Sequence, residues 1–138
     1  MKALLAFAFA TFTSTLLAQP VDDAMLAGLT ALKQDDHRTA EHAFDRAVEN
    51  DPTNGKTWYY RAVNRMVLGD NDGALKDLDH LLAMEPADVH AMLRRAEVYR
   101  LKGEDQRANS DLHRVIAMHA IGPAAEHALF ELGRIAME

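Results

Sequence analysis

The sequence predicts an all-α protein, a solenoid of three helix–turn–helix repeats closed by a C-terminal capping helix. The first observation is that the chain matches itself at a constant offset of 34 residues, the separation of Ala40 from Ala74 and of Ala74 from Ala108. The recurring residues are Ala40, Phe44, Ala47 and Pro52, then Ala74, Leu78, Leu81 and Pro86, then Ala108, Leu112 and Val115. The second observation is helical spacing of apolar residues on both sides of a short turn. A fixed period of this size indicates stacked copies of one supersecondary unit, which form a scaffold that presents a surface.

The second copy, residues 55–88, shows the unit most clearly. Its two apolar stripes are Trp58, Ala62 and Met66, followed by Ala74, Leu78 and Leu81. The stretch between them, 69–73, contains Gly, Asn and Asp, which favour turns. Pro86 ends the second helix, because the residue before a proline disfavours the helical region. Two helices joined this tightly pack antiparallel, so we expect Ala62 and Ala74 at their close crossing.

The same pattern along the chain predicts seven helices. They span 22–34, 37–50, 55–69, 71–84, 88–103, 105–118 and 122–137. The repeats are then 21–54, 55–88 and 89–122, within one domain of residues 19–138. The last helix starts at Gly122-Pro123, where proline suits the first helical turn. It is either a cap with a polar outer side or the first helix of a truncated fourth repeat, and in both cases it packs on the third copy.

The N-terminus has the layout of a secretory signal peptide, which we assign to residues 1–18. Lys2 supplies a positive charge, and Ala3–Ala18 is uncharged and mostly apolar, shorter than the roughly 20 residues that span a bilayer. The mature chain would begin near Gln19 in the periplasm, beyond the inner membrane, with no stable membrane anchor. The chain has no cysteine, which excludes disulfides and lipidation at cysteine. An uncleaved anchor and a fortuitous apolar leader are the alternatives.

No group of residues in the sequence points to catalysis, a cofactor or a metal. The seven histidines include no His-Glu-x-x-His, and the chain has no glycine-rich phosphate loop or Gly-x-Ser-x-Gly. The formal net charge of −6 becomes −7 without the leader, which holds Lys2 and no acid. An acidic surface argues against nucleic acid and attracts basic partners. We therefore expect no enzyme, no catalytic residue, no cofactor and no metal.

The repeating unit resembles the tetratricopeptide repeat (TPR) over residues 21–122. Trp58 matches the family's aromatic fourth position. The small eighth position is matched by Gly28, Ala62 and Ala96, the alanine at the twentieth by Ala40, Ala74 and Ala108, and the large apolar residue at the twenty-fourth by Phe44, Leu78 and Leu112. The third copy departs from the pattern, with Ala120 in place of the proline. The resemblance implies a right-handed superhelix whose first helices line the concave side.

Two positions of the unit carry charge together. The seventh position of the unit is arginine in the second and third copies, Arg61 and Arg95. The twenty-third position is aspartate in the same two copies, Asp77 and Asp111, and the first copy has alanine at both positions. We expect each arginine to meet the aspartate of its own repeat, or that of the neighbouring repeat, as a structural ion pair. Coincidence in a charged protein is the alternative.

The resemblance places a partner-binding groove along the first helices. Its expected residues are Met25, Leu29, Lys56, Tyr59, Tyr60, Val63, His90, Leu93, Arg94, Glu97 and Arg100. They form an apolar floor with a cationic rim of Lys56, Arg94 and Arg100. Some members of the family clamp a C-terminal carboxylate here, but Met25 and Leu29 replace the first lysine and asparagine, so we do not expect that function. The alternative is that the cap helix or a homodimer covers the floor.

These observations predict a protein–protein interaction module, a periplasmic adaptor or scaffold that binds a peptide or helical segment in the concave groove. The alternative is a self-assembling structural subunit of an envelope complex, in which the groove joins copies of the chain. The sequence does not identify the partner.

Overall fold

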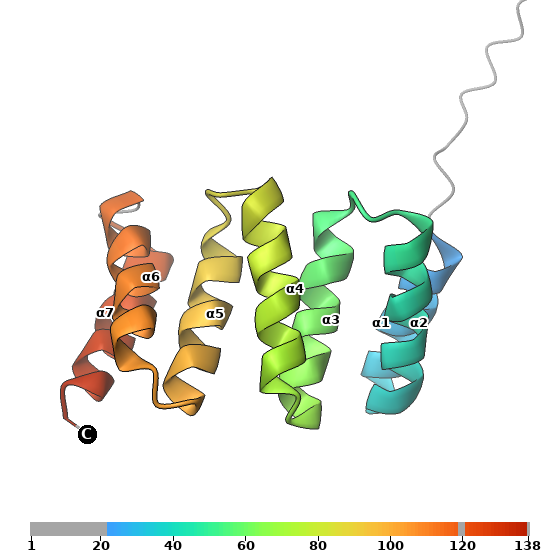
Figure 1. The fold of residues 1–138 in the computed structure, drawn as a ribbon, viewed down its shortest axis with the longest axis horizontal. Coiled ribbons are helices and arrows are strands. Elements are labelled where there is room, and N and C mark those ends of the chain that lie inside the picture. Colours follow the sequence, from blue (N-terminus) through green and yellow to red (C-terminus); the bar gives the residue numbers. More distant parts are fainter. Residues whose placement is uncertain (1–21, 119–120, 138) are drawn as a thin grey trace, which may run out of the picture.

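Seven helices stand in an antiparallel row in the computed structural model, which describes residues 22–118 and 121–137. They are α1 (Asp23–Lys33), α2 (His37–Asn50), α3 (Gly55–Leu68), α4 (Asn71–Met84), α5 (Val89–Leu101), α6 (Asp105–Met118) and α7 (Pro123–Ile135). In Figure 1, α7 closes the row at the end opposite α1 and α2. Every helix begins and ends close to where the sequence prediction placed it. The all-α solenoid with a capping helix is confirmed, and the leader expected at 1–18 lies outside the described residues.

Polar caps start the helices where the sequence changes from loop to apolar stripe. The carboxylates of Asp36 and Asp70 accept hydrogen bonds from backbone N–H groups of the first turns of α2 and α4, at 3.0 and 2.9 Å. The side chains of Asp22, Asn54 and Asp88 do the same for α1, α3 and α5. A cap of this kind satisfies one backbone donor that the helix leaves unpaired, and contributes about 1 kcal/mol.

Small residues at the helix crossings explain the constant repeat period. Ala40, Ala74 and Ala108 are fully buried, one in each helix pair, as is Ala62. The burial of Ala62 and Ala74 expected from the sequence is therefore confirmed. In the first pair α1 and α2 leave no room even for a methyl group at Gly28, because it would lie 2.5 Å from the ring of Phe44.

The first helices of the repeats form one layer of the row. Besides packing on its neighbour in sequence, α3 contacts α5, and α5 contacts α7. Ala128 of α7 belongs to the same hydrophobic core as Leu78 and Leu112, so α7 extends the third repeat as the sequence predicted. Within the described part of the chain, no helix is long and apolar enough to cross a membrane.

Candidate functional site

A hollow of about 900 Å³ lies along the first helices, between α1, α3 and the start of α5. Six of the predicted groove residues line it: Met25, Leu29, Lys56, Tyr59, Tyr60 and His90. Two aliphatic and two aromatic side chains make its floor. Lys56 and His90 are exposed at its edge. The structure thus brings together a little more than half of the expected groove.

The floor is held in place by contacts within and between repeats. The ring of Tyr60 stacks on Phe44 at 6.3 Å between centroids, and Tyr59 meets Tyr60 edge-on at 5.8 Å. The sulfur of Met25 accepts hydrogen bonds from Asn54 Nδ2 and Thr57 Oγ1, each at 3.7 Å. These contacts fix the aromatic side chains before any ligand arrives, which reduces the ordering cost of binding.

The rest of the lining comes from the loops between repeats and from the first residue of α3, which the sequence prediction missed. These residues are Thr53, Asn54, Gly55, Glu85 and Asp88. A signal for two of them was present, because Asn54 and Asp88 stand one repeat period apart and cap the first helices of consecutive repeats. The caps therefore add polar groups at one end of the hollow.

The remaining predicted groove residues, on α3 and α5, lie outside the lining of this hollow. Val63 is half-buried on α3, and Leu93 packs against the hydrophobic core. Arg94 Nη1 donates to Glu97 at 2.9 Å, and Arg94 Nε donates to the hydroxyl of Tyr59 at 3.4 Å. The hydrogen bond to Tyr59, partly opposed by burial and helped by Glu97, raises the pKa of Arg94. Arg94 is thus tied to the floor and to its own helix.

The cationic rim is smaller than expected, because Arg100 forms an ion pair with a residue of α7. Its Nε lies 3.4 Å from a carboxylate oxygen of Glu131 on α7, and the two side chains are only 17% and 15% exposed. The cap helix therefore covers the C-terminal end of the predicted groove. Lys56 is the remaining predicted cation that stands exposed at the hollow.

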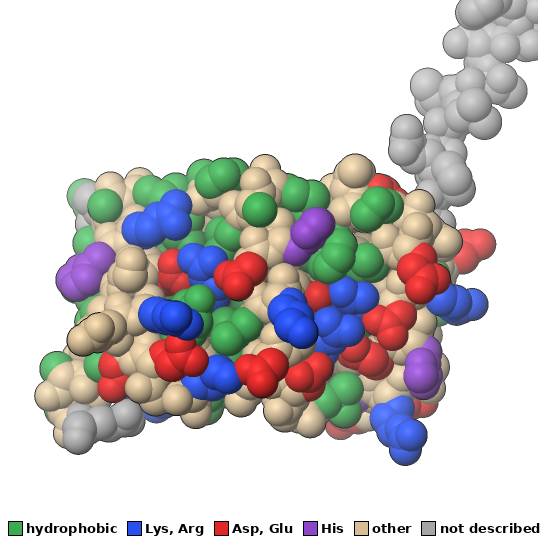
Figure 2. Space-filling model, in the orientation of Figure 1, with side chains coloured by type: hydrophobic (Ala, Val, Ile, Leu, Met, Phe, Trp, Pro, Cys, Tyr) green, Lys and Arg blue, Asp and Glu red, His purple; other side chains and the backbone are tan. Residues whose placement is uncertain are grey.

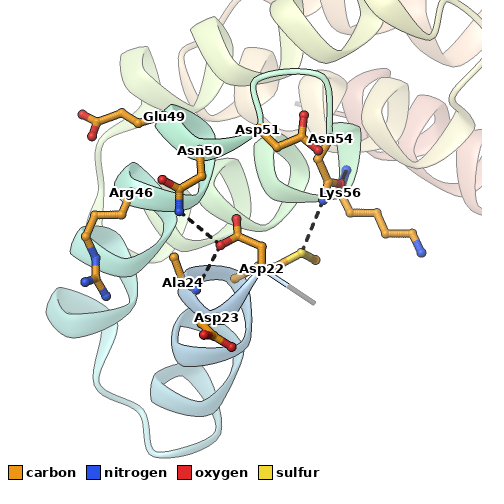
Figure 3. Close-up of a pocket in the computed structure, with 10 residues that line it drawn as sticks. Asp22, Asp23, Ala24, Arg46, Glu49, Asn50, Asp51, Asn54 and Lys56 are labelled. Carbon is orange, nitrogen blue, oxygen red and sulfur yellow. Dashed lines mark hydrogen bonds between the residues drawn. The ribbon is translucent and has the colours of Figure 1, made fainter. Parts of the chain in front are cut away.

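A second hollow, of about 1030 Å³, lies at the N-terminal end of the row (Figure 3). Its charged residues are Asp22, Asp23, Arg46, Glu49, Asp51 and Lys56. Figure 3 shows Asn50 turned toward Asp22, to which its Nδ2 donates at 3.3 Å. Because its lining is largely charged and lacks aromatic residues, this hollow offers a partner less apolar surface than the first one.

The predicted ion pairs are confirmed, and they join three helices each. Arg61 donates through Nε and Nη2 to the carboxylate of Asp77 at 2.9 and 2.7 Å, and through Nη1 to Asp45 on α2 at 2.9 Å. Burial alone would lower the pKa of Arg61, but the bonds to the two aspartates raise it. Each such cluster pins a repeat to the one before it.

The same cluster recurs in the next repeat. Arg95 donates to both oxygens of Asp111 at 2.7 Å and to Asp79 on α4 at 2.7 Å. The hydrogen bond to Asp111, against the opposing effect of burial, raises the pKa of Arg95. Figure 2 shows basic and acidic side chains side by side in a band across one face of the row. These charges are satisfied within the fold, so we assign them to stability and not to chemistry.

A polar contact between α2 and α3 was not foreseen from the sequence. Asn64 is fully buried, and its Nδ2 donates to Glu41 Oε2 at 2.9 Å and to the carbonyl of His37 at 3.0 Å. Its Oδ1 lies 2.9 Å from His37 Nδ1. In the described residues, no three histidine or acidic side chains come together as a metal site would require.

Stacked antiparallel helix pairs with a constant repeat period and a hollow along the first helices define a helical-repeat scaffold of the protein-interaction type. The sequence model of the tetratricopeptide repeat matches residues 25–63 and 61–109. The chain belongs to the tetratricopeptide repeat family, as the resemblance implied.

Relatives and solved structures agree with this family. The chain is 28% identical over 106 residues to tetratricopeptide repeat protein 36 of Danio rerio, a match that covers 74% of this chain and 57% of that protein. It therefore spans little more than half the length of this relative. The first TPR of Spaghetti (RPAP3), bound to an HSP90 peptide, has a TM-score of 0.76 at 21% identity and covers 83% of this chain and 89% of its own.

A bacterial structure has the same fold. The Yersinia enterocolitica type III secretion chaperone SycD, in complex with a peptide of the translocator YopD, has a TM-score of 0.77 at 17% identity. The superposition covers 84% of this chain and 92% of the chaperone. At these identities the likeness establishes the fold, and the ligands belong to those proteins.

Proposed function

We propose that this chain is a non-enzymatic adaptor that binds a segment of another protein in the hollow between α1, α3 and α5. The observation that carries the proposal is the preformed floor of Met25, Leu29, Tyr59 and Tyr60. An apolar concave surface with a few polar groups at its edge is the usual form of a binding site. Peptides bound to solved structures of this fold support the same use.

The lining indicates the kind of segment. An apolar side chain of the partner would enter between Tyr59 and Met25, where aromatic surface is desolvated at low entropic cost. Lys56 would attract an acidic group of the partner, while Glu85 and Asp88, which line the same hollow, would disfavour an acidic group beside them. A free C-terminal carboxylate is not expected as the anchor, because Met25 and Leu29 carry no cation.

The compartment is also part of the proposal. We place the adaptor in the periplasm, because residues 1–18 have the charge and apolar length of a cleaved leader. The formal net charge of the mature chain, −7, keeps it soluble there and draws it toward basic partners.

The test is a peptide selection against residues 19–138, followed by binding measurements on single variants. Tyr59→Ala should weaken binding of the selected peptides by more than about 1 kcal/mol, because an aromatic anchor dominates such contacts. Tyr99→Ala is the matched control, since Tyr99 is also half-buried but lies outside the hollow. An equal loss of affinity in both variants would mean that the substitutions act through the stability of the fold and not through the groove.

A second variant strengthens the test. Tyr59→Ala combined with Val63→Asp places a charge beside the hollow and should abolish binding of the same peptides. Full affinity in this double variant would move the site to the convex face or to α7. If the double variant instead changed the mass of the protein in solution, the groove would be a contact between copies of the chain.

A further inference from the structure

Helix α7 carries an apolar face that the described part of the chain leaves uncovered. Leu129, Phe130 and Met137, at and just beyond its C-terminal half, are 58%, 64% and 82% exposed. The side of α7 opposite Phe130 holds the buried Ala125 and Ala128, which pack on the third repeat, and Leu129, one turn after Ala125, lies at the border between the two sides. Isolated apolar residues on a surface are ordinary, but Phe130 and Met137, with Leu129 at their border, form a patch at the end of a terminal helix.

The exposed side of α7 has the spacing of a helix–helix seam. Glu126, Phe130 and Gly133 follow one another at steps of four and three, which places them in one stripe of α7, and Met137 continues this spacing just beyond the end of the helix. A methyl group added to Gly133 would meet nothing within 4 Å. Packing within the chain therefore does not require glycine here, although glycine weakens a helix interior. On a seam, the missing side chain lets a second helix come close.

The charges beside the seam are self-complementary. Glu126 lies one helical turn before Phe130, and Arg134 lies one turn after it, at the same separation. If two copies of α7 pack antiparallel with Phe130 on the two-fold axis, Glu126 of each copy faces Arg134 of the other. Arg134 is 38% exposed and reaches Glu131 of its own helix at 3.2 Å, so its head group already lies at the surface.

We propose that two copies of this chain associate through an antiparallel pair of α7 helices, centred on Phe130 and flanked by two Glu126–Arg134 pairs. A second copy fits this face better than an unrelated protein, because the charge pattern matches itself under a two-fold rotation. The end position of α7 in Figure 1, away from α1, leaves the hollow of each copy open. The assembly would present two binding grooves and strengthen attachment to a partner with repeated segments.

The expected dimer is weak. A helix of 13 residues is about 20 Å long at 1.5 Å per residue, which is small compared with a standard interface. We therefore expect a reversible equilibrium that depends on protein concentration over the micromolar range.

Sedimentation equilibrium of residues 19–138, which contain every described helix, tests the proposal. Phe130→Glu should weaken the dimer at least about tenfold, because it removes the central aromatic contact and adds two facing carboxylates. Leu26→Glu on α1 is the matched control, since Leu26 is 53% exposed at the other end of the row and should leave the equilibrium unchanged. Circular dichroism melting should be unchanged in both variants, because both side chains are exposed.

A charge exchange tests the antiparallel register. Glu126→Arg and Arg134→Glu should each weaken the dimer, because like charges then face each other across the axis. The double variant should recover the dimer, because it restores opposite charges at both contacts.

Three results would overturn the proposal. One is a monomer at every concentration up to the millimolar range. Another is a dimer insensitive to Phe130→Glu, or a charge-exchanged double variant as weak as the two singles. The last is an equal effect of Leu26→Glu, which would indicate end-to-end stacking of α7 on α1.

Discussion

Replacing Arg95 with methionine should destabilise the protein more than the same change at Arg61. The reason is the number of cations around each buried aspartate. The side chain of Asp111 is 4% exposed, and its hydrogen bonds within the described residues all come from Arg95. Asp77 is 2% exposed, but when Arg61 is removed it keeps the bond from Arg65 Nη1 at 2.9 Å.

The expected losses follow from these contacts. A buried carboxylate left without its cation costs about 3–5 kcal/mol, which is the value for Arg95→Met. Arg61→Met should cost about 1.5–3 kcal/mol, the contribution of hydrogen bonds to a charged group that keeps another partner. Each variant also loses one bond to a more exposed aspartate, Asp79 or Asp45, worth about 0–1 kcal/mol, so this contribution cancels in the comparison.

Urea unfolding of residues 19–138, followed by circular dichroism, measures both losses. At roughly 4 °C per kcal/mol, Arg95→Met should also lower the Tm by about 12–20 °C. The double variant Arg95→Met/Asp111→Leu should recover most of the stability, because an apolar pair of similar volume often equals a buried ion pair.

Two results would refute this reasoning. Equal losses in the two arginine variants would show that Arg65 does not support Asp77. A loss below about 1 kcal/mol for Arg95→Met would show that Asp111 is hydrated and not buried.

Three other predictions concern packing and export. Ala74→Leu should cost about 1–3 kcal/mol in the same unfolding assay because Ala74 is fully buried at a helix crossing, and an unchanged midpoint would contradict the repeat register. Gly28→Ala should also destabilise, by about 1–3 kcal/mol, because its methyl group would lie 2.5 Å from Phe44; Gly133→Ala, where a methyl group meets nothing within 4 Å, is the control. Intact mass of the protein from a periplasmic extract should begin at Gln19 or within a few residues, and a cytoplasmic protein that keeps its first residues would exclude the leader.

Part of the groove could be predicted from the sequence because helical spacing is local. Met25 and Leu29 share one face of α1, and Lys56 and Tyr59 share one face of α3. Once the repeat period is known, these faces must turn the same way in each repeat. The loops were missed because a loop has no periodic spacing from which its direction can be inferred.

Only the tertiary structure shows which partner each charged side chain contacts. Arg100 was expected at the rim of the groove, yet it pairs with Glu131 of α7, two helices further along the chain. Only the packing of α2, α3 and α4 shows that Arg65 bridges Glu41 and Asp77. Charge pairing depends on which long side chains can reach each other, and sequence spacing does not limit that reach across helices.

The sequence by itself determined the repeat, its register and the alanine crossings, because only a small residue fits where two helices touch and such a position must recur with the unit. It also predicted that Arg61 and Arg95 pair with Asp77 and Asp111, since both positions are charged or apolar together among the copies, and the structure shows that each arginine meets the aspartate of its own repeat. Only the tertiary structure decided how far the groove stays open, because α7 folds back on α5 and covers its end. It also decided which face of α7 remains exposed, since that depends on how the last helix meets the third repeat.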